Sequence, residues 1–369
     1  MSGDKRKVVY VLGAGFSFGT EHEVSWGHSK LSMPLQNDLL EKIFKFNSRV
    51  IHDLDPLAKT IRTYFNPKGY RSKRGVGASR HKDLNGLSVE EVVTFFEEMI
   101  RDSDGTNKNS FRIAETKLRR LTLELIEYLS INGEPNRNAI LKAFRNDILA
   151  TDTIITFNWD TLLDRVLANN KNKSRQWHPA WGYGRAVGKL FTYQGRKVLK
   201  SPNKHATLLK LHGSINWLAN DNNFTIPVRF SSNGNLDDVV MMPPKMLKRE
   251  IWGEEPTELP TAPARGNWAV HTKGLYKKLW HEAEESMSIA KKIVFIGYSF
   301  PAADTSVFGL IRRSLSKAKA GDGEYPEIRI VDPEAASLSK KFIQSFQIEI
   351  PSKHQYLTLS SYVRKESRK

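Results

Sequence analysis

Short apolar runs that are rich in β-branched residues recur along the chain and predict buried strands of a parallel sheet. The first run, Val8–Leu12, lies near the N-terminus and is followed at once by glycines. Four more runs lie at residues 154–157, 207–211, 293–297 and 328–331, and a helical pattern follows the first of these four. Strands that alternate with helices indicate an α/β fold with a parallel sheet.

A helical pattern fills the long interval between the first two runs. Ser88 precedes Glu91 at the spacing of a helix capping box, and the segments 112–129 and 138–149 carry apolar residues at helical spacing. These segments predict a helical insertion over residues 35–150, placed after the first strand and its turn.

The chain length of 369 residues allows two or three domains with a sizeable core. We predict a discontinuous α/β domain from residues 1–34 and 151–350, a helical insertion domain at 35–150, and a basic C-terminal tail at 351–369. In open α/β sheets, ligands bind beyond the carboxyl ends of the strands. Polar residues that directly follow the predicted strands are therefore the candidates for a site.

The turn after the first strand contains Gly13, Ala14 and Gly15. Glycine permits a tight turn and lets backbone amides approach a ligand, and a helix that starts there would offer unpaired amides to a phosphate. A plain strand-to-loop turn is the alternative interpretation. The turn also departs from the common dinucleotide motif G-x-G-x-x-G, because its third glycine, Gly19, comes one residue late.

The same stretch also matches a nucleophile elbow, G-x-S-x-G, centred on Ser17. That motif requires a sheet and an oxyanion loop before the serine. Only one strand precedes Ser17, so the sequence disfavours a serine hydrolase.

Polar residues follow the second and third strands. Asn158 and Asp160 could contact a ligand, but Asn158 could equally turn the chain and Asp160 could cap the next helix. His212 follows the third strand and could act as a general base near neutral pH, or be a structural histidine.

The last two strands end in the same way. Gly297 and Ser299 are candidates for contacts to a phosphate or a ribose, and Asp304 is placed to cap the helix that follows. Asp332 is an acidic residue placed to contact an adenosine ribose. Five strands with polar residues at one edge are stronger evidence for a site than any one of them.

Composition narrows the possible chemistry. The chain has no cysteine, which excludes disulfides, thiolate nucleophiles and cysteine-ligated zinc. No run approaches the ~20 apolar residues of a membrane span, and the first residues lack the features of a signal peptide. We therefore expect a cytoplasmic protein with no membrane association.

The formal net charge is +17, with basic residues gathered at 68–82, 245–249, 312–319 and 364–369. Such a charge fits an anionic small molecule, an acidic protein partner or nucleic acid. Specific nucleic-acid recognition is disfavoured because no recognisable nucleic-acid module accompanies the charge.

Taken together, these motifs resemble the sirtuin (Sir2-like) family, in its divergent NAD-hydrolysing branch from bacterial antiviral defence. The resemblance covers residues 7–34 and 151 to about 350, and no single motif carries it alone. It implies a Rossmann-like sheet that binds NAD. The matches occur in this order: GAGFS at 13–17, TFNWD at 156–160, LHGS at 211–214, GYSFPAAD at 297–304 and VDP at 331–333.

The resemblance assigns roles to individual residues. It implies that Asn158 and His212 are catalytic and that Asp160 recognises the nicotinamide carboxamide. The remaining matches are implied contacts to the nucleotide: Gly13, Ala14, Gly15 and Ser17 in the phosphate loop, Thr156 before the catalytic asparagine, Gly297 and Ser299 near ribose and phosphate, and Asp332 near the adenosine.

Two departures from the family favour hydrolysis of NAD over protein deacetylation. Deacetylating sirtuins carry a four-cysteine zinc ribbon, and here the residues 31–34 stand where an arginine-containing acyl site should begin. We therefore expect cleavage of NAD, as substrate, to nicotinamide and ADP-ribose with no metal. We also expect a defence effector that is activated by homo-oligomer assembly or by a partner such as a defence-associated ATPase. The alternative is a subunit that senses NAD or ADP-ribose, or binds nucleic acid, without turnover.

Overall fold

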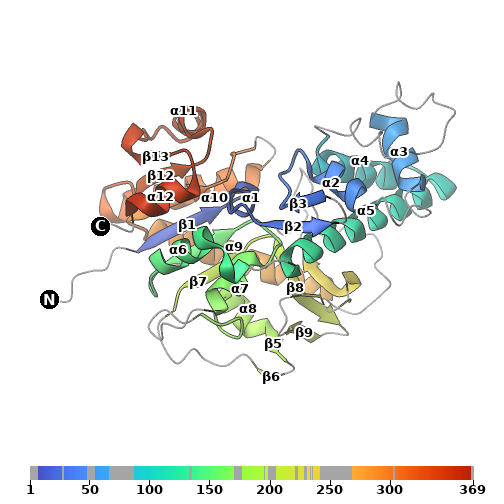
Figure 1. Ribbon diagram of the computed structural model, residues 1–369, viewed down its shortest axis with the longest axis horizontal. Coiled ribbons are helices and arrows are strands. Elements are labelled where there is room, and N and C mark those ends of the chain that lie inside the picture. The colour runs from blue at the N-terminus through green and yellow to red at the C-terminus, as the bar shows by residue number, and fades with distance from the viewer. Residues whose placement is uncertain are drawn as a thin grey trace.

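The computed structural model gives the arrangement of most of the chain (Figure 1). The part that it describes comprises residues 7–26, 29–47, 55–65, 87–132, 135–169, 177–194, 196–197, 205–220, 223–227, 231–232, 234, 236–241, 268–301 and 304–366.

A six-stranded sheet forms the centre of the protein, with the strands in the order β13-β12-β11-β1-β4-β7 and every neighbouring pair parallel. Counted along the chain, this is the 3-2-1-4-5-6 order of a doubly wound fold, and it confirms the predicted Rossmann-like α/β class. The strands are β1 (Val8–Leu12), β4 (Thr153–Thr156), β7 (Thr207–Lys210), β11 (Lys292–Ile296), β12 (Glu327–Val331) and β13 (Gln355–Tyr356).

The five predicted strands are all present, within a residue or two of their expected ends. Phe157 and Leu211 lie just past β4 and β7, where their amides still donate to Leu12 O at 3.2 Å and to Thr156 O at 2.9 Å. The buried faces of these strands explain why apolar runs predicted them so well.

Part of the expected basic tail at 351–369 contributes to the sheet and its cover, namely residues 351–366. β13 supplies the sixth strand, and α12 (Leu359–Glu366) places Tyr362 and Val363 in the core. A strand of two residues carries no periodic signal, so the sequence could not reveal it.

Two layers of helices enclose this sheet (Figure 1). α6 contacts both α7 and α12, whereas α9 contacts both α8 and α10. The bounds of these helices and of α11 are α6 (Ala139–Asp147), α7 (Leu162–Ala168), α8 (Gly184–Leu190), α9 (Trp268–Ser288), α10 (Thr305–Asp322) and α11 (Ala335–Phe346).

A second, helical lobe has its own apolar core. Its capping box is present: the Glu90 amide donates to Ser88 Oγ at 3.1 Å and the Ser88 amide to Glu91 Oε2 at 3.3 Å. The lobe consists of β2 (Glu23–Trp26), β3 (Ser29–Ser32), α2 (Leu39–Asn47), α3 (Asp55–Phe65), α4 (Val89–Asp102) and α5 (Gly105–Ile131).

The packing divides the chain at other positions than the expected bounds of 35 and 150. The β2–β3 hairpin packs with the helical lobe, because Val24 and Leu31 belong to that core. α6 packs on the main sheet, where the Phe144 ring lies 5.2 Å from the ring of Tyr10.

A smaller sheet that the sequence did not predict is built from strands that lie before and after β7 in the chain, in the order β10-β8-β9-β5-β6. Its strands are β5 (Phe191–Tyr193), β6 (Arg196–Lys197), β8 (Gly213–Asn220), β9 (Asn223–Ile226) and β10 (Val239–Met241). The remaining short elements are α1 (Ala14–Gly19), η4 (Pro135–Arg137), η6 (Leu236–Asp238) and η8 (Ser352–His354).

An ion-pair network ties α12 to the sheet. The buried Arg329 of β12 pairs with both Glu327 and Glu366, and Lys292 Nζ lies 3.6 Å from Glu366 Oε2. Burial alone would raise the pKa of Glu366, but the hydrogen bond and charge of Arg329 lower it.

We expect Glu366→Gln to lower the free energy of unfolding by about 1–3 kcal/mol at pH 7, since it removes a hydrogen-bonded charge from Arg329. A carboxylate with a lowered pKa contributes stability above its ordinary pKa, and this contribution is lost as the pH falls. The difference between variant and parent should therefore shrink from about pH 5 to about pH 3, measured by urea unfolding. Glu349→Gln, at an exposed position, is the matched control. If the difference in unfolding free energy did not change with pH, the lowered pKa of Glu366 would be contradicted.

Candidate functional site

The candidate residues lie at the carboxyl ends of five neighbouring strands. Across the sheet, Asp332 follows β12, Gly297 follows β11, the Gly13 turn follows β1, Asn158 follows β4, and His212 lies just beyond β7. The strand order reverses at β1, which is where doubly wound folds bind their ligands. The structure thus brings the predicted residues to one edge of the sheet.

The glycines of the first turn allow β1 and β11 to approach closely at this edge. A Cβ atom built on Gly13 would lie 2.4 Å from Gly297 O, and one on Gly15 would lie 2.7 Å from Gly297 Cα. Gly297 itself has φ +59°, in the left-handed region. No atom lies within 4 Å of a Cβ on Gly19, so the late third glycine is not required for packing.

The backbone amides of the turn are engaged with the protein. Gly13 N donates to Ile296 O at 3.1 Å, Gly15 N to Gly297 O at 2.9 Å, and Phe16 N to Gly13 O at 3.0 Å. The Gly13 and Gly15 amides thus hold the turn against β11, and the absence of side chains on these glycines permits that close approach. The polar side chains around the turn therefore carry much of the chemistry that this edge offers.

Ser17 joins Asn158 to Asp160. The Asn158 Nδ2 amide donates to Gly13 O at 2.9 Å and to Ser17 Oγ at 3.0 Å, and the Ser17 hydroxyl donates to Asp160 Oδ2 at 2.8 Å. Ser17 and Asp160 are buried, whereas Asn158 is partly exposed. Three predicted residues from two distant segments thus form one hydrogen-bonded group.

Asn158 and Asp160 make the contacts that the structural interpretations predict. The amide of Asn158 donates to Thr156 Oγ1 at 3.1 Å, so Thr156 holds the turn after β4. Asp160 Oδ1 accepts from the Leu162 amide at 3.1 Å, at the start of α7. The two alternatives that the sequence left open are compatible, because the contacts that fix this loop also place its side chains.

Aromatic side chains surround His212, which is 9% exposed. Its ring centroid lies 5.1 Å from that of Phe157 and 6.4 Å from that of Trp280, and Phe157 lies 5.1 Å from Tyr298. The sequence analysis missed all three aromatic residues. Phe157 and Tyr298 lie inside motifs that it used, but Trp280 lies in the middle of a helix with no signal of its own.

Asp304 does not cap α10 with its side chain, contrary to expectation. Its Oδ2 instead accepts a hydrogen bond from the Tyr298 hydroxyl at 2.8 Å. Burial raises the pKa of Tyr298, and the charge of Asp304 adds to that effect. This contact fixes the Tyr298 ring next to Phe157.

The adenosine-side candidates lie at the outer part of the edge. Ser299 is exposed, and its carbonyl accepts from Lys341 Nζ at 3.2 Å. Asp332 Oδ1 accepts from the Glu334 amide at 2.9 Å, just before α11, and burial raises its pKa. Both follow strands on the far side of β1 from His212.

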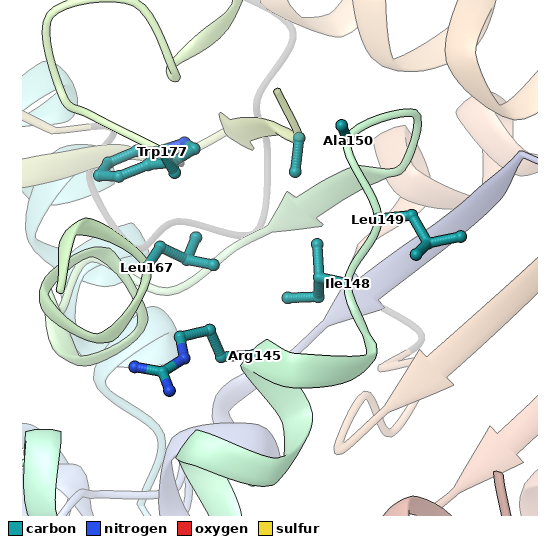
Figure 2. Close-up of a pocket in the computed structure, with 7 residues that line it drawn as sticks. Arg145, Ile148, Leu149, Ala150, Leu167 and Trp177 are labelled. Carbon is teal, nitrogen blue, oxygen red and sulfur yellow. The ribbon is translucent and has the colours of Figure 1, made fainter. Parts of the chain in front are cut away.

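A small hollow lies where the chain enters β4 and β7, at the opposite edge of the sheet from the candidate residues. Figure 2 shows residues that line it. Its space of about 10 Å³ suits roughly one water molecule. Its lining is mainly apolar and comes from Arg145, Ile148, Leu149, Ala150, Leu167, Trp177 and Ala206. We therefore do not assign a ligand to it.

The basic clusters at 68–82 and 245–249 lie outside the described residues, as do 367–369. In the cluster that is described, Arg313 and Lys317 both bind Glu284, with Arg313 Nε 2.7 Å from Glu284 Oε2. Burial alone would raise the pKa of Glu284, but these two hydrogen bonds lower it. Part of the positive charge is thus used within the protein.

Two features are absent from the described part of the chain. It contains no group of three or more histidine, aspartate or glutamate residues arranged to hold a metal ion. Nor does it contain a helix with the length and apolar character needed to cross a bilayer.

The fold and site define a doubly wound α/β protein with candidate ligand-binding residues where the strand order reverses. No protein-family model and no curated protein matches the sequence. Solved structures of Sir2 proteins are similar to it. One concerns the mechanism and regulation of Sir2 enzymes; it is 15% identical, the match covers 99% of this chain and 93% of that chain, and the TM-score is 0.36. Another is a Sir2 homolog–NAD complex, with 13% identity, coverage of 98% of this chain and 91% of that chain, and a TM-score of 0.37. A third is an ADP-ribose complex of a Sir2 homologue variant, with 14% identity, coverage of 99% of this chain and 94% of that chain, and a TM-score of 0.35. Similarities this low do not establish a family for the chain.

Proposed function

We propose that this protein is an NAD hydrolase that cleaves NAD to nicotinamide and ADP-ribose. The observation that carries the proposal is the hydrogen-bonded group of Asn158, Ser17 and Asp160 at the reversal of strand order, with His212 beyond the adjacent strand. The ordered sequence motifs that resemble NAD-hydrolysing sirtuins support the same assignment.

The reaction breaks the bond between ribose C1′ and the pyridinium nitrogen. The electron pair leaves with nicotinamide, and water adds to the oxocarbenium-like ribose and releases one proton. An enzyme must hold the bond, stabilise the developing cation and deprotonate the water. We propose that the His212 imidazole accepts this proton and that Asn158 orients the water and the ribose hydroxyls.

Asp160 is suited to hold the nicotinamide carboxamide. Each of its carboxylate oxygens accepts one hydrogen bond from the protein, one from Ser17 and one from Leu162. A carboxylate oxygen has a further lone pair, so an amide N–H of the substrate can bind without displacing either contact. The two protein contacts fix the carboxylate before substrate arrives.

Aromatic residues make the surroundings of His212 apolar. Phe157 and Trp280 are buried next to the histidine ring, and Tyr298 is buried against Phe157. A low-dielectric environment strengthens the electrostatic contacts to a developing cation.

We further propose that the enzyme acts in bacterial antiviral defence by depleting NAD. Unrestrained hydrolysis would harm the cell that makes it, so we expect a low basal rate that rises when the enzyme assembles into a homo-oligomer or binds a partner such as a defence-associated ATPase. The sequence resemblance supports this part of the proposal.

We expect purified protein to release nicotinamide and ADP-ribose from NAD in equal amounts. The measurement is chromatography of the products over a range of protein concentrations, with a heat-denatured sample as control. A rate per chain that rises with concentration would support activation by assembly. Folded protein that releases neither product at any concentration but binds ADP-ribose would favour the sensing alternative.

A further inference from the structure

A buried charged pair lies beneath the loop that carries Asn158 and Asp160. Lys210, the last residue of β7, is 1% exposed, and its Nζ lies 3.3 Å from Oδ2 of the equally buried Asp164 on α7. The same ammonium group donates a hydrogen bond to the backbone carbonyl of Asp160. Taking two charges out of water costs several kcal/mol per ion, and apolar residues of similar volume often serve stability as well. The pair therefore calls for an explanation other than stability.

Hydrogen bonds continue from this pair through buried side chains. Asp164 accepts from the Tyr183 hydroxyl, which in turn accepts from Asn216 Nδ2 at 3.0 Å. Asn216 Oδ1 accepts from Ser214 Oγ at 2.6 Å. The five side chains of this network are all buried: Lys210, Asp164, Tyr183, Asn216 and Ser214.

The network returns to the site loop at its far end. The Ser214 hydroxyl lies 3.5 Å from Trp159 O, and the Ile215 amide donates to the same carbonyl at 3.1 Å. Residues 157–161 belong to no strand or helix, so their carbonyls need partners from elsewhere. β7 and β8 supply them for Trp159 and Asp160.

The loop is thus held from two sides. On one side, Ser17 binds the Asp160 carboxylate and the Asn158 carboxamide. On the other side, Lys210 binds the Asp160 carbonyl. Loss of the second contact leaves the backbone free to rotate the side chains that the first contact aligns.

We propose that Lys210 is a positioning residue, which clamps the Asp160 carbonyl so that Asn158 and Asp160 keep the orientation that the reaction requires. This inference rests on the proposed hydrolase function. The Asp164 carboxylate contacts the same ammonium group from the side of α7 and so directs it at the carbonyl.

The test compares Lys210→Met with the double variant Lys210→Met/Asp164→Asn. Methionine preserves the length of the side chain but cannot donate, and it leaves the Asp164 charge buried without its cation. The double variant removes that charge and should recover part of the lost thermal stability. Lys340→Met, at an exposed position of α11, is the matched control.

We expect kcat for NAD cleavage to fall about 10–100-fold in both Lys210 variants, because small displacements of positioned groups cost that much. Hydrogen exchange of the 157–162 backbone should be about tenfold faster in both. A merely structural role predicts that recovered stability restores kcat and protection in the double variant, and this result would overturn the proposal.

Different results would contradict the proposed hydrolase function and the positioning role of Lys210. Parent protein that cleaves no NAD contradicts the proposed function, whereas hydrogen exchange still reports on the clamp. Unchanged exchange at 157–162 in both Lys210 variants would overturn the positioning role, whatever the activity. If Lys210→Met does not fold, the double variant alone decides between these outcomes.

Discussion

Replacing His212 with alanine should lower the rate of nicotinamide release by about 10²–10⁴-fold, the usual contribution of a general base. Asn158→Ala should cause a loss of the same order, because it removes the group assigned to orient water and the ribose hydroxyls. Asn158 is partly exposed and His212 lies at the edge of the sheet, so neither truncation empties the centre of the core.

The initial rate of nicotinamide release measures both effects, and binding of ADP-ribose by calorimetry shows whether the nucleotide site survives. Matched controls lie on exposed surfaces of the same protein: His281→Ala, where the ring lies 3.2 Å from Glu285, and Asn146→Ala at the end of α6. Parental turnover in a folded Asn158 or His212 variant would remove that residue from the mechanism.

The strands and the polar residues at their ends could be predicted because an apolar run and the residues that follow it are local features of the sequence. The runs are buried on both faces and are therefore largely apolar, as Val8–Leu12 is throughout, and the chain must turn where a run stops. Once the strands are parallel, the residues after them share one edge, whatever the order of the strands. Asn158, His212 and Asp332 were found in this way.

Contacts between those residues could not be predicted, because they depend on the order of the strands. Ser17 and Asp160 are 143 positions apart, and only the pairing of β1 with β4 places the hydroxyl on the carboxylate. Trp280 lies on a helix that the sequence gives no reason to place near His212.

The burial of Lys210 and its pairing with Asp164 could not be predicted from the sequence either. A lysine within an apolar run suggests a strand position that reaches water, but here the side chain is buried. Its partner Asp164 comes from the helix after the neighbouring strand, so nothing local in the sequence marks the pair. The buried network is therefore a finding of the structure alone.

Gly297→Ala should be among the most destabilising single substitutions in the protein, with a loss of about 3–5 kcal/mol in the free energy of unfolding. An added Cβ would lie 2.1 Å from the backbone nitrogen of Phe16 and 2.2 Å from the carbonyl carbon of Gly15. Backbone atoms cannot rotate away as a side chain can. The φ of +59° adds a further cost of roughly 1–2 kcal/mol for a residue with a Cβ.

Relief of this overlap requires the Gly13–Gly15 turn to move away from β11. Asn158 donates to Gly13 O and to Ser17 Oγ, so the same movement disturbs the candidate catalytic group. We therefore expect a folded remainder of Gly297→Ala to lose NAD cleavage along with stability.

Urea unfolding at pH 7 measures the loss, and two glycines in ordinary backbone conformation provide the comparison. A Cβ on Gly19 or Gly321 would meet no atom within 4 Å. Alanine there should leave stability unchanged or raise it by up to about 1 kcal/mol, since it restricts the unfolded chain. A Gly297→Ala protein as stable as these two variants would show that the β1 and β11 turns can separate freely. The close approach of the two turns would then not define the site.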